Sequence, residues 1–124
     1  MEQPKKGELL WMIPDAYIPP QSSGSMESHE SVCVLNCYAE DAYLKFNIYF
    51  EDRTPIENIQ VVVKGKRTLH IRTSTLEKNG VYIPKGTSYA IEVESNIPVI
   101  VQYSRLDTTQ SENALMTTIA YPIK

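Results

Sequence analysis

The chain of 124 residues is poor in cysteine, and its two cysteines cannot easily pair. Cys33 and Cys37 stand four positions apart in the sequence. On an extended strand this spacing separates their Cα atoms by about 13 Å, whereas a disulfide requires about 7 Å or less. An isolated pair of this kind also lacks the further thiolates or imidazoles of a structural zinc site. We therefore expect two free thiols in small, half-buried strand positions.

Long apolar runs are absent as well. Residues 1–14 combine early charges with a short apolar run, but Pro14 and Asp15 interrupt it. The run is too short for a membrane span or for the apolar region of a signal peptide. We therefore expect a soluble, cytoplasmic protein without membrane insertion.

The familiar catalytic motifs are missing from the sequence. There is no G-x-S-x-G, no P-loop, no G-x-G-x-x-G and no H-E-x-x-H. Ser28, His29 and Glu30 are residue types found in catalytic triads, but neighbours along an extended chain point to opposite faces. His29, His70 and a carboxylate could bind a metal if the fold assembled them, although structural histidines are the commoner case. We predict no enzyme activity, no catalytic residues, no metal and no cofactor.

Positive charge is scarce, since the formal net charge is -3. Without a global positive field, nucleic acid is an unlikely partner, although a local basic patch is not excluded. The densest basic run covers residues 64–72 and contains Lys64, Lys66, Arg67, His70 and Arg72. Such charges can simply protect an edge strand. Alternatively, His70 and Arg72 share a strand face and could bind an anion, a sugar or nucleic acid.

Alternating apolar and polar residues are abundant, and they predict strands. Residues 42–50 alternate strictly, residues 67–72 and 88–95 follow the same period, and other segments are rich in β-branched and aromatic residues. Breakers recur at intervals of roughly ten residues, among them residues 95–98 and an irregular stretch at 18–30. We predict an all-β fold: an antiparallel β-sandwich of about eight strands, a single domain over residues 1–124, with a flexible loop at 18–30.

One polar segment interrupts the strand pattern near the C-terminus. Gln102, Arg105, Asp107 and Asn113 lie between two strand-like runs. We expect a core strand to end here. The chain would then reverse through a turn that these polar side chains stabilise, and a second strand would return to the sandwich. These polar side chains could stabilise only their own turn or a subunit contact, or they could bind a ligand. The candidate ligand-binding residues are His29, His70, Arg72, Gln102, Arg105, Asp107 and Asn113.

Six blocks in order resemble the sensory rhodopsin transducer family. They are the strand around Trp11 and the segments at 17–20, 28–36, 66–72, 95–107 and 110–121. The resemblance implies an all-β sandwich and a cyclic homotetramer, and buried polar pairs could fix the register of such an assembly. It also implies a role in signal relay, in DNA binding or in binding a carbohydrate-like ligand. Leu69 departs from the basic residue expected in its block, which weakens the case for DNA.

Together these arguments favour a non-enzymatic, homo-oligomeric binding or signal-transducer module, tetrameric by resemblance. Its expected partners are further copies of itself, a sugar-like small molecule and a protein signalling partner. The alternatives are an adaptor that acts through protein–protein contact and a DNA-binding regulator.

Overall fold

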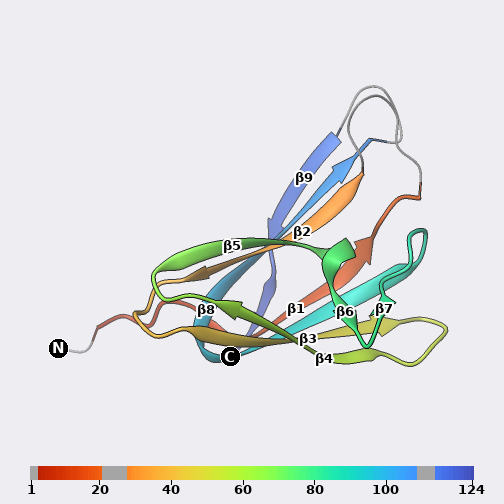
Figure 1. Cartoon of the computed structure of the whole chain (residues 1–124). Helices are drawn as coiled ribbons and strands as arrows, with labels where there is room; N and C mark the ends of the chain where they lie inside the picture. The colour runs from red at the N-terminus through yellow and green to blue at the C-terminus, as the bar shows by residue number, and fades with distance from the viewer. Residues whose placement is uncertain (1–2, 21–27, 109–113) are drawn as a thin grey trace.

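The computed structural model describes residues 3–20, 28–108 and 114–124, which form two packed layers of antiparallel strands (Figure 1). Sheet A has the order β10 (Tyr121–Ile123), β1 (Glu8–Tyr17), the first half of β8 (Ser88–Asp107), β3 (Ala42–Phe50) and β4 (Ile56–Val63). Sheet B has the order β9 (Ala114–Ile119), the second half of β8, β2 (His29–Asn36) and β5 (Arg67–Arg72). A 3-10 turn, η1 (Thr73–Thr75), leads to a small hairpin of β6 (Glu77–Lys78) and β7 (Val81–Tyr82).

This architecture confirms the predicted β-sandwich. The described part of the chain contains ten strands instead of about eight, because the sequence pattern did not reveal the short β6, β7 and β10. No helix within the described ranges is long and apolar enough to cross a membrane. Cys33 and Cys37 are both free thiols, as predicted.

Strand β8 belongs to both sheets, and here the sequence prediction was wrong. Residues 95–98 were expected to break the chain, yet β8 continues from Ser88 to Asp107. Its first half pairs with β1 and β3, and its second half pairs with β2 and β9. Pro98 lies between Ser95, which pairs with β3, and Ile100, which pairs with β2. The proline thus stands where the strand changes partners, a position at which a missing N–H donor is tolerated.

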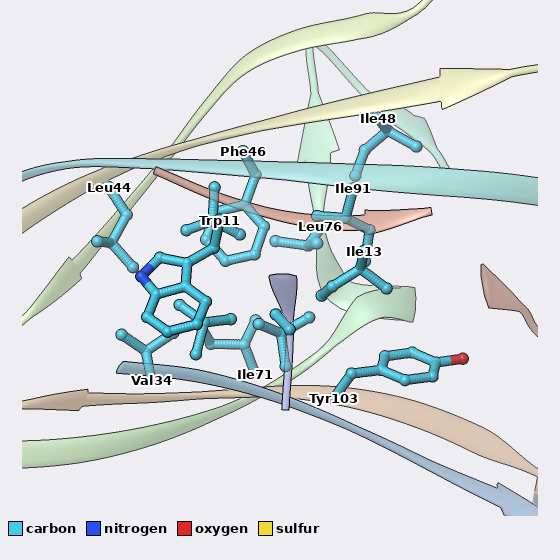
Figure 2. Packing of buried hydrophobic residues seen from close by; sticks show 14 of the residues in the cluster. Trp11, Ile13, Val34, Leu44, Phe46, Ile48, Ile71, Leu76, Ile91 and Tyr103 are labelled. Atoms are coloured by element: carbon cyan, nitrogen blue, oxygen red, sulfur yellow. The ribbon is translucent and has the colours of Figure 1, made fainter. Parts of the chain in front are cut away.

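The core lies between the two sheets and follows the predicted alternation. Ala42, Leu44, Phe46 and Ile48 of β3 are all buried, whereas Tyr43, Lys45 and Tyr49 are exposed. Figure 2 shows Trp11 and Phe46 between the layers, facing side chains such as Val34 and Ile71 from the opposite sheet. The Trp11 indole Nε1 donates a hydrogen bond of 2.9 Å to the Val99 carbonyl oxygen. Trp11 is therefore a core residue, as its apolar strand context predicted.

The predicted loop at 18–30 is shorter than expected at its C-terminal end. Strand β2 already begins at His29, and Ile18, Pro19 and Ser28 are buried. Residues 21–27 of this predicted loop lie outside the described residues. Ser28 Oγ lies 2.9 Å from Thr108 Oγ1 and accepts the Thr108 backbone N–H at 2.8 Å. These buried bonds join the start of β2 to the chain that follows β8.

Candidate functional site

Strand β2 places one carboxylate inside the sandwich. Glu30 has the same strand parity as Val32 and Val34, so its side chain points toward the core, and only 1% of the residue is exposed. A buried carboxylate is tolerated when its charge is paired and its lone pairs accept hydrogen bonds. Four donors satisfy Glu30: the Tyr17 backbone N–H at 2.8 Å, Arg105 Nε at 2.9 Å, and the hydroxyls of Tyr89 and Tyr103.

These groups form a network that we call the Glu30 network: the Tyr17 backbone, Glu30, Thr73, Tyr89, Tyr103 and Arg105. Thr73 Oγ1 lies 2.9 Å from the Tyr89 hydroxyl, and Arg105 Nε lies 3.3 Å from the Tyr103 hydroxyl. The network therefore joins β1, β2, η1 and both halves of β8. The single Glu30 carboxylate thus links strands of both sheets.

Burial shapes the electrostatics of the network. Burial and the neighbouring Glu30 carboxylate raise the pKa of the Tyr89 hydroxyl well above its usual range. Burial and the hydrogen bond to Glu30 raise the pKa of Tyr103 in the same way. Burial opposes the charge of Arg105, but its bonds to Glu30 and Tyr103 outweigh this cost and raise the guanidinium pKa. Both tyrosines thus remain neutral donors, and Arg105 remains a cation.

A pocket of about 450 Å³ opens beside this network, between β1, β8, β9 and β10. Such a volume falls within the range of small-molecule sites. Tyr103 and Arg105 of the Glu30 network line it, and 19% of the Arg105 side chain is accessible. The remaining lining includes Met12, Asp15, Met116, Thr118 and Tyr121. The pocket thus combines a fixed cation with an aromatic ring, a carboxylate and apolar walls.

This combination suits a ligand that carries hydroxyl groups. Arg105 and Asp15 supply planar groups that can donate to and accept from neighbouring hydroxyls. Tyr121 is 67% exposed, so its ring offers a free face to the C–H surface of a sugar. The Glu30 bond prevents Arg105 from reorienting, so little side-chain entropy remains to be lost on binding.

Among the residues predicted from sequence, the structure places Arg105 in this site and distributes the others elsewhere. The outer face of sheet B, away from the Glu30 network, carries His29, His70, Arg72 and Gln102. His70 pairs with Cys33, which in turn pairs with Gln102. Two strand spacings, about 10 Å in total, therefore separate His70 from Gln102. His70 and Arg72 together line a separate hollow of about 610 Å³ between β4 and β5, which His29 and Gln102 do not line.

The other two predicted residues belong to the end of the polar segment. Asp107 is the last residue of β8 and is half-buried opposite Ala114. Asn113 lies outside the described residues. The core strand was expected to end where the polar segment at 102–113 begins, but residues 102–107 continue β8, and Gln102 Nε2 donates across the sheet to Thr117 Oγ1. Gln102 therefore links β8 to β9.

Sequence reasoning missed Glu30, Thr73, Tyr89 and Tyr103 as site residues. A signal for Glu30 was present: it shares its parity with Val32 and Val34, and a charged residue on the inward face of a strand is seldom unpaired. Tyr103 and Arg105 likewise share the parity of the buried Val101. Their meeting could not be predicted, because it depends on β2 and β8 being neighbours.

Comparisons with known proteins agree with this fold. A family model described as "ASRT: Anabaena sensory rhodopsin transducer" matches residues 6–122. The chain belongs to this family. The crystal structure of Thermotoga maritima 1070 superposes with a TM-score of 0.83 at 40% identity, covering 94% of this chain and 96% of that chain. The Anabaena sensory rhodopsin transducer superposes with a TM-score of 0.74 at 38% identity, covering 87% of this chain and 96% of that chain. A search of curated proteins gave no match.

Proposed function

We propose that this member of the transducer family is a non-enzymatic, homo-oligomeric signal-transducer module whose pocket beside Arg105 binds a carbohydrate-like small ligand. The observation that carries the proposal is the position of Arg105, which lines the pocket while its Nε is held 2.9 Å from the buried Glu30. A ligand that contacts Arg105 would therefore contact the Glu30 network, which links strands of both sheets. We place the protein in the cytoplasm, where its two thiols stay reduced.

Binding without catalysis is supported by how Glu30 is used. Its oxygens already accept from Tyr17, Tyr89, Tyr103 and Arg105. A general base needs a lone pair that can reach a substrate proton, and these donors occupy those of Glu30. The carboxylate therefore acts as a fixed structural charge that orients Arg105.

Calorimetric titration with D-glucose, D-mannose and D-glucuronate at millimolar concentration tests the pocket. We expect saturable heat for at least one sugar and a loss of affinity of roughly ten-fold or more in Tyr121→Ala, because the ring supplies the apolar contact. Tyr43→Ala is the matched control, since Tyr43 is 59% exposed but does not line this pocket. No heat with any sugar, or equal loss in both variants, would argue against the carbohydrate ligand.

The alternative is an adaptor that acts through protein–protein contact. The observation in its favour is the name of a relative, a sensory rhodopsin transducer, at 38% identity. In that case a partner protein would use an exposed surface, and pocket variants would leave its binding unchanged. Affinity capture with wild type and Tyr121→Ala distinguishes the two, since a pure adaptor retains the same partner in both.

A DNA-binding role would rest on the exposed cations of β5 and of the turn before it. Arg67, His70 and Arg72 are exposed on β5, and Lys64 and Lys66 precede them. The net charge of -3 opposes such binding. If a duplex did bind through these residues, its affinity would fall steeply with salt and with Arg72→Ala, and a gel-shift series over salt concentration checks both.

A further inference from the structure

The β6–β7 hairpin carries apolar side chains that the core does not bury. Leu76 before the hairpin and Ile83 after it are 3% and 4% exposed, so both of its ends are anchored in the core. The turn at residues 79–80 has positive φ angles of 53° and 81°, which suit a tight two-residue hairpin. Between the two anchors, Val81 and Tyr82 remain 54% and 52% exposed. Apolar side chains that gather on an anchored surface often mark a binding site.

Val81 and Tyr82 line a pocket of about 390 Å³ between this hairpin and the turn that joins β3 to β4. Figure 1 shows the hairpin beside β4. The volume falls within the range of small-molecule sites. The pocket shares no lining residue with the pocket beside Arg105, so it is a separate candidate site. Its apolar lining consists of Phe50, Pro55, Ile56, Val81, Tyr82 and Pro84.

Arg53 lines the pocket with part of its guanidinium group still available. Its Nε and Nη2 donate to the two carboxylate oxygens of Asp52 at 2.9 and 3.2 Å. The guanidinium also lies over the Phe50 ring, 5.3 Å from the ring centroid. Because a guanidinium has five N–H groups, the edge formed by Nη1 and Nη2 can still bind a second carboxylate. Asp52 and Phe50 therefore orient Arg53 without using all of its donors.

A second cation and a carboxylate line the same pocket. Lys78 Nζ donates to the Asn58 carbonyl oxygen at 3.3 Å, which uses one of the three donors of its ammonium group. Glu57 is exposed and also lines the pocket. With Asp52, which binds Arg53, the charged groups at the pocket are two cations and two carboxylates. A ligand that carries both a negative and a positive charge finds an opposite charge for each here.

We propose that this pocket binds a free α-amino acid with an aromatic or large apolar side chain. The ligand carboxylate bonds to Arg53 and Lys78, and the ligand ammonium group bonds to Glu57. The ligand side chain packs against Tyr82 and Val81 in the apolar part of the pocket. A free amino acid fits better than a peptide, because only the free molecule carries both charges on the same carbon atom. This site is independent of the sugar pocket and of any assembly.

Calorimetric titration of the full chain with L-phenylalanine at neutral pH tests the ligand class. We expect saturable binding at millimolar concentration. N-acetyl-L-phenylalanine lacks the positive charge, and L-phenylalaninamide lacks the negative one. Each should bind roughly ten-fold more weakly or worse, because one charged partner in the pocket stays unused. No saturable heat with L-phenylalanine, or equal affinity for all three compounds, would overturn the proposal.

Variants of the pocket test its location. Tyr82→Ala and Arg53→Gln should each weaken L-phenylalanine binding by roughly ten-fold or more, and thermal unfolding should show that both fold, since both side chains are exposed. The matched controls are Tyr43→Ala and Arg72→Ala, which change exposed residues outside the pocket and should bind as wild type does. Tyr121→Ala, which alters the sugar pocket, should also bind L-phenylalanine normally. Unchanged affinity in Tyr82→Ala and Arg53→Gln would contradict this site.

Discussion

Arg105 Nε lies 2.9 Å from Glu30 Oε2, and these two residues differ sharply in their access to water. The Glu30 side chain is fully buried, whereas 19% of the Arg105 side chain is accessible from the pocket. One member of the pair therefore belongs to the core and the other to the candidate binding site. The ion pair therefore gives the site one direct connection to the core.

Removing Arg105 should destabilise the protein strongly. Arg105→Ala leaves the Glu30 charge buried without its cation, which typically costs about 3–5 kcal/mol of unfolding free energy. The exposed Arg72→Ala on β5 should change it by no more than about 0.5 kcal/mol. Urea unfolding followed by tryptophan fluorescence measures both. Equal costs for the two variants would show that the ion pair is not structural.

Stability should fall at high pH because of the buried tyrosines. Burial beside Glu30 raises the pKa of Tyr89 and Tyr103 in the folded state. In the unfolded state the pKa of a tyrosine is about 10. Above that pH the unfolded chain binds fewer protons, so each residue lowers stability by up to about 1.4 kcal/mol per pH unit. Below that pH their contribution is constant.

Urea midpoints measured from about pH 8 to about pH 11 check this dependence. Tyr89→Phe should reduce the slope above about pH 10, although it also lowers stability throughout by removing a donor to Glu30. Arg72→Ala removes an exposed side chain and no tyrosine, so it should leave the slope as in wild type. Identical slopes in all three proteins would mean that the buried hydroxyls titrate normally.

Gly7 should tolerate no side chain. It has a φ of 109°, and a Cβ built there would lie 2.1 Å from the Val99 carbonyl oxygen. That oxygen also accepts the Trp11 indole N–H, so displacing it disturbs the core. Gly7→Ala should cost more than about 2 kcal/mol. Gly80→Ala, at a φ of 81° but in open space, should cost only about 1 kcal/mol, and thermal unfolding compares the two.

Asn36 should be hard to replace because its amide joins two segments. Its Nδ2 donates to the Glu40 and Val63 carbonyls at 2.8 and 3.2 Å, and its Oδ1 accepts the Tyr38 N–H at 3.0 Å. Asn36→Ala leaves these groups without partners and should cost about 2–4 kcal/mol. The exposed Asn96→Ala loses one bond to Tyr43 and should cost under about 1 kcal/mol. Similar chemical unfolding midpoints would contradict this role.

The alternation of residues 42–50 was sufficient to predict a strand and its buried face, because the period of a strand is a local property. The continuity of β8 was not predictable in this way. Asn96 and Pro98 look like a break locally, but pairing with one sheet before them and another after them holds the strand together. That pairing depends on residues far away in the sequence.

In the candidate site, too, local properties were predictable from the sequence, whereas contacts between distant residues were not. Arg105 was identified because it stands with other planar polar residues in one segment between two strand-like runs. Gln102 was grouped with it because the two are close in sequence, and His70 because it shares a strand face with Arg72, yet the pleat directs both to the outer face of sheet B. Glu30 shares the inward parity of β2, which predicts burial but not its partner. Its partner Arg105 is 75 positions away in the sequence.

The Arg105 Nε–H resonance in a ¹⁵N correlation spectrum tests the central claim most directly. This proton bonds to the buried Glu30 and lies at the edge of the pocket. During titration with D-glucose, D-mannose or D-glucuronate it should shift and saturate together with the backbone amides of Met116 and Tyr121, while that of Tyr43 stays in place. A spectrum unchanged by all three sugars at tens of millimolar would contradict a carbohydrate site beside Arg105.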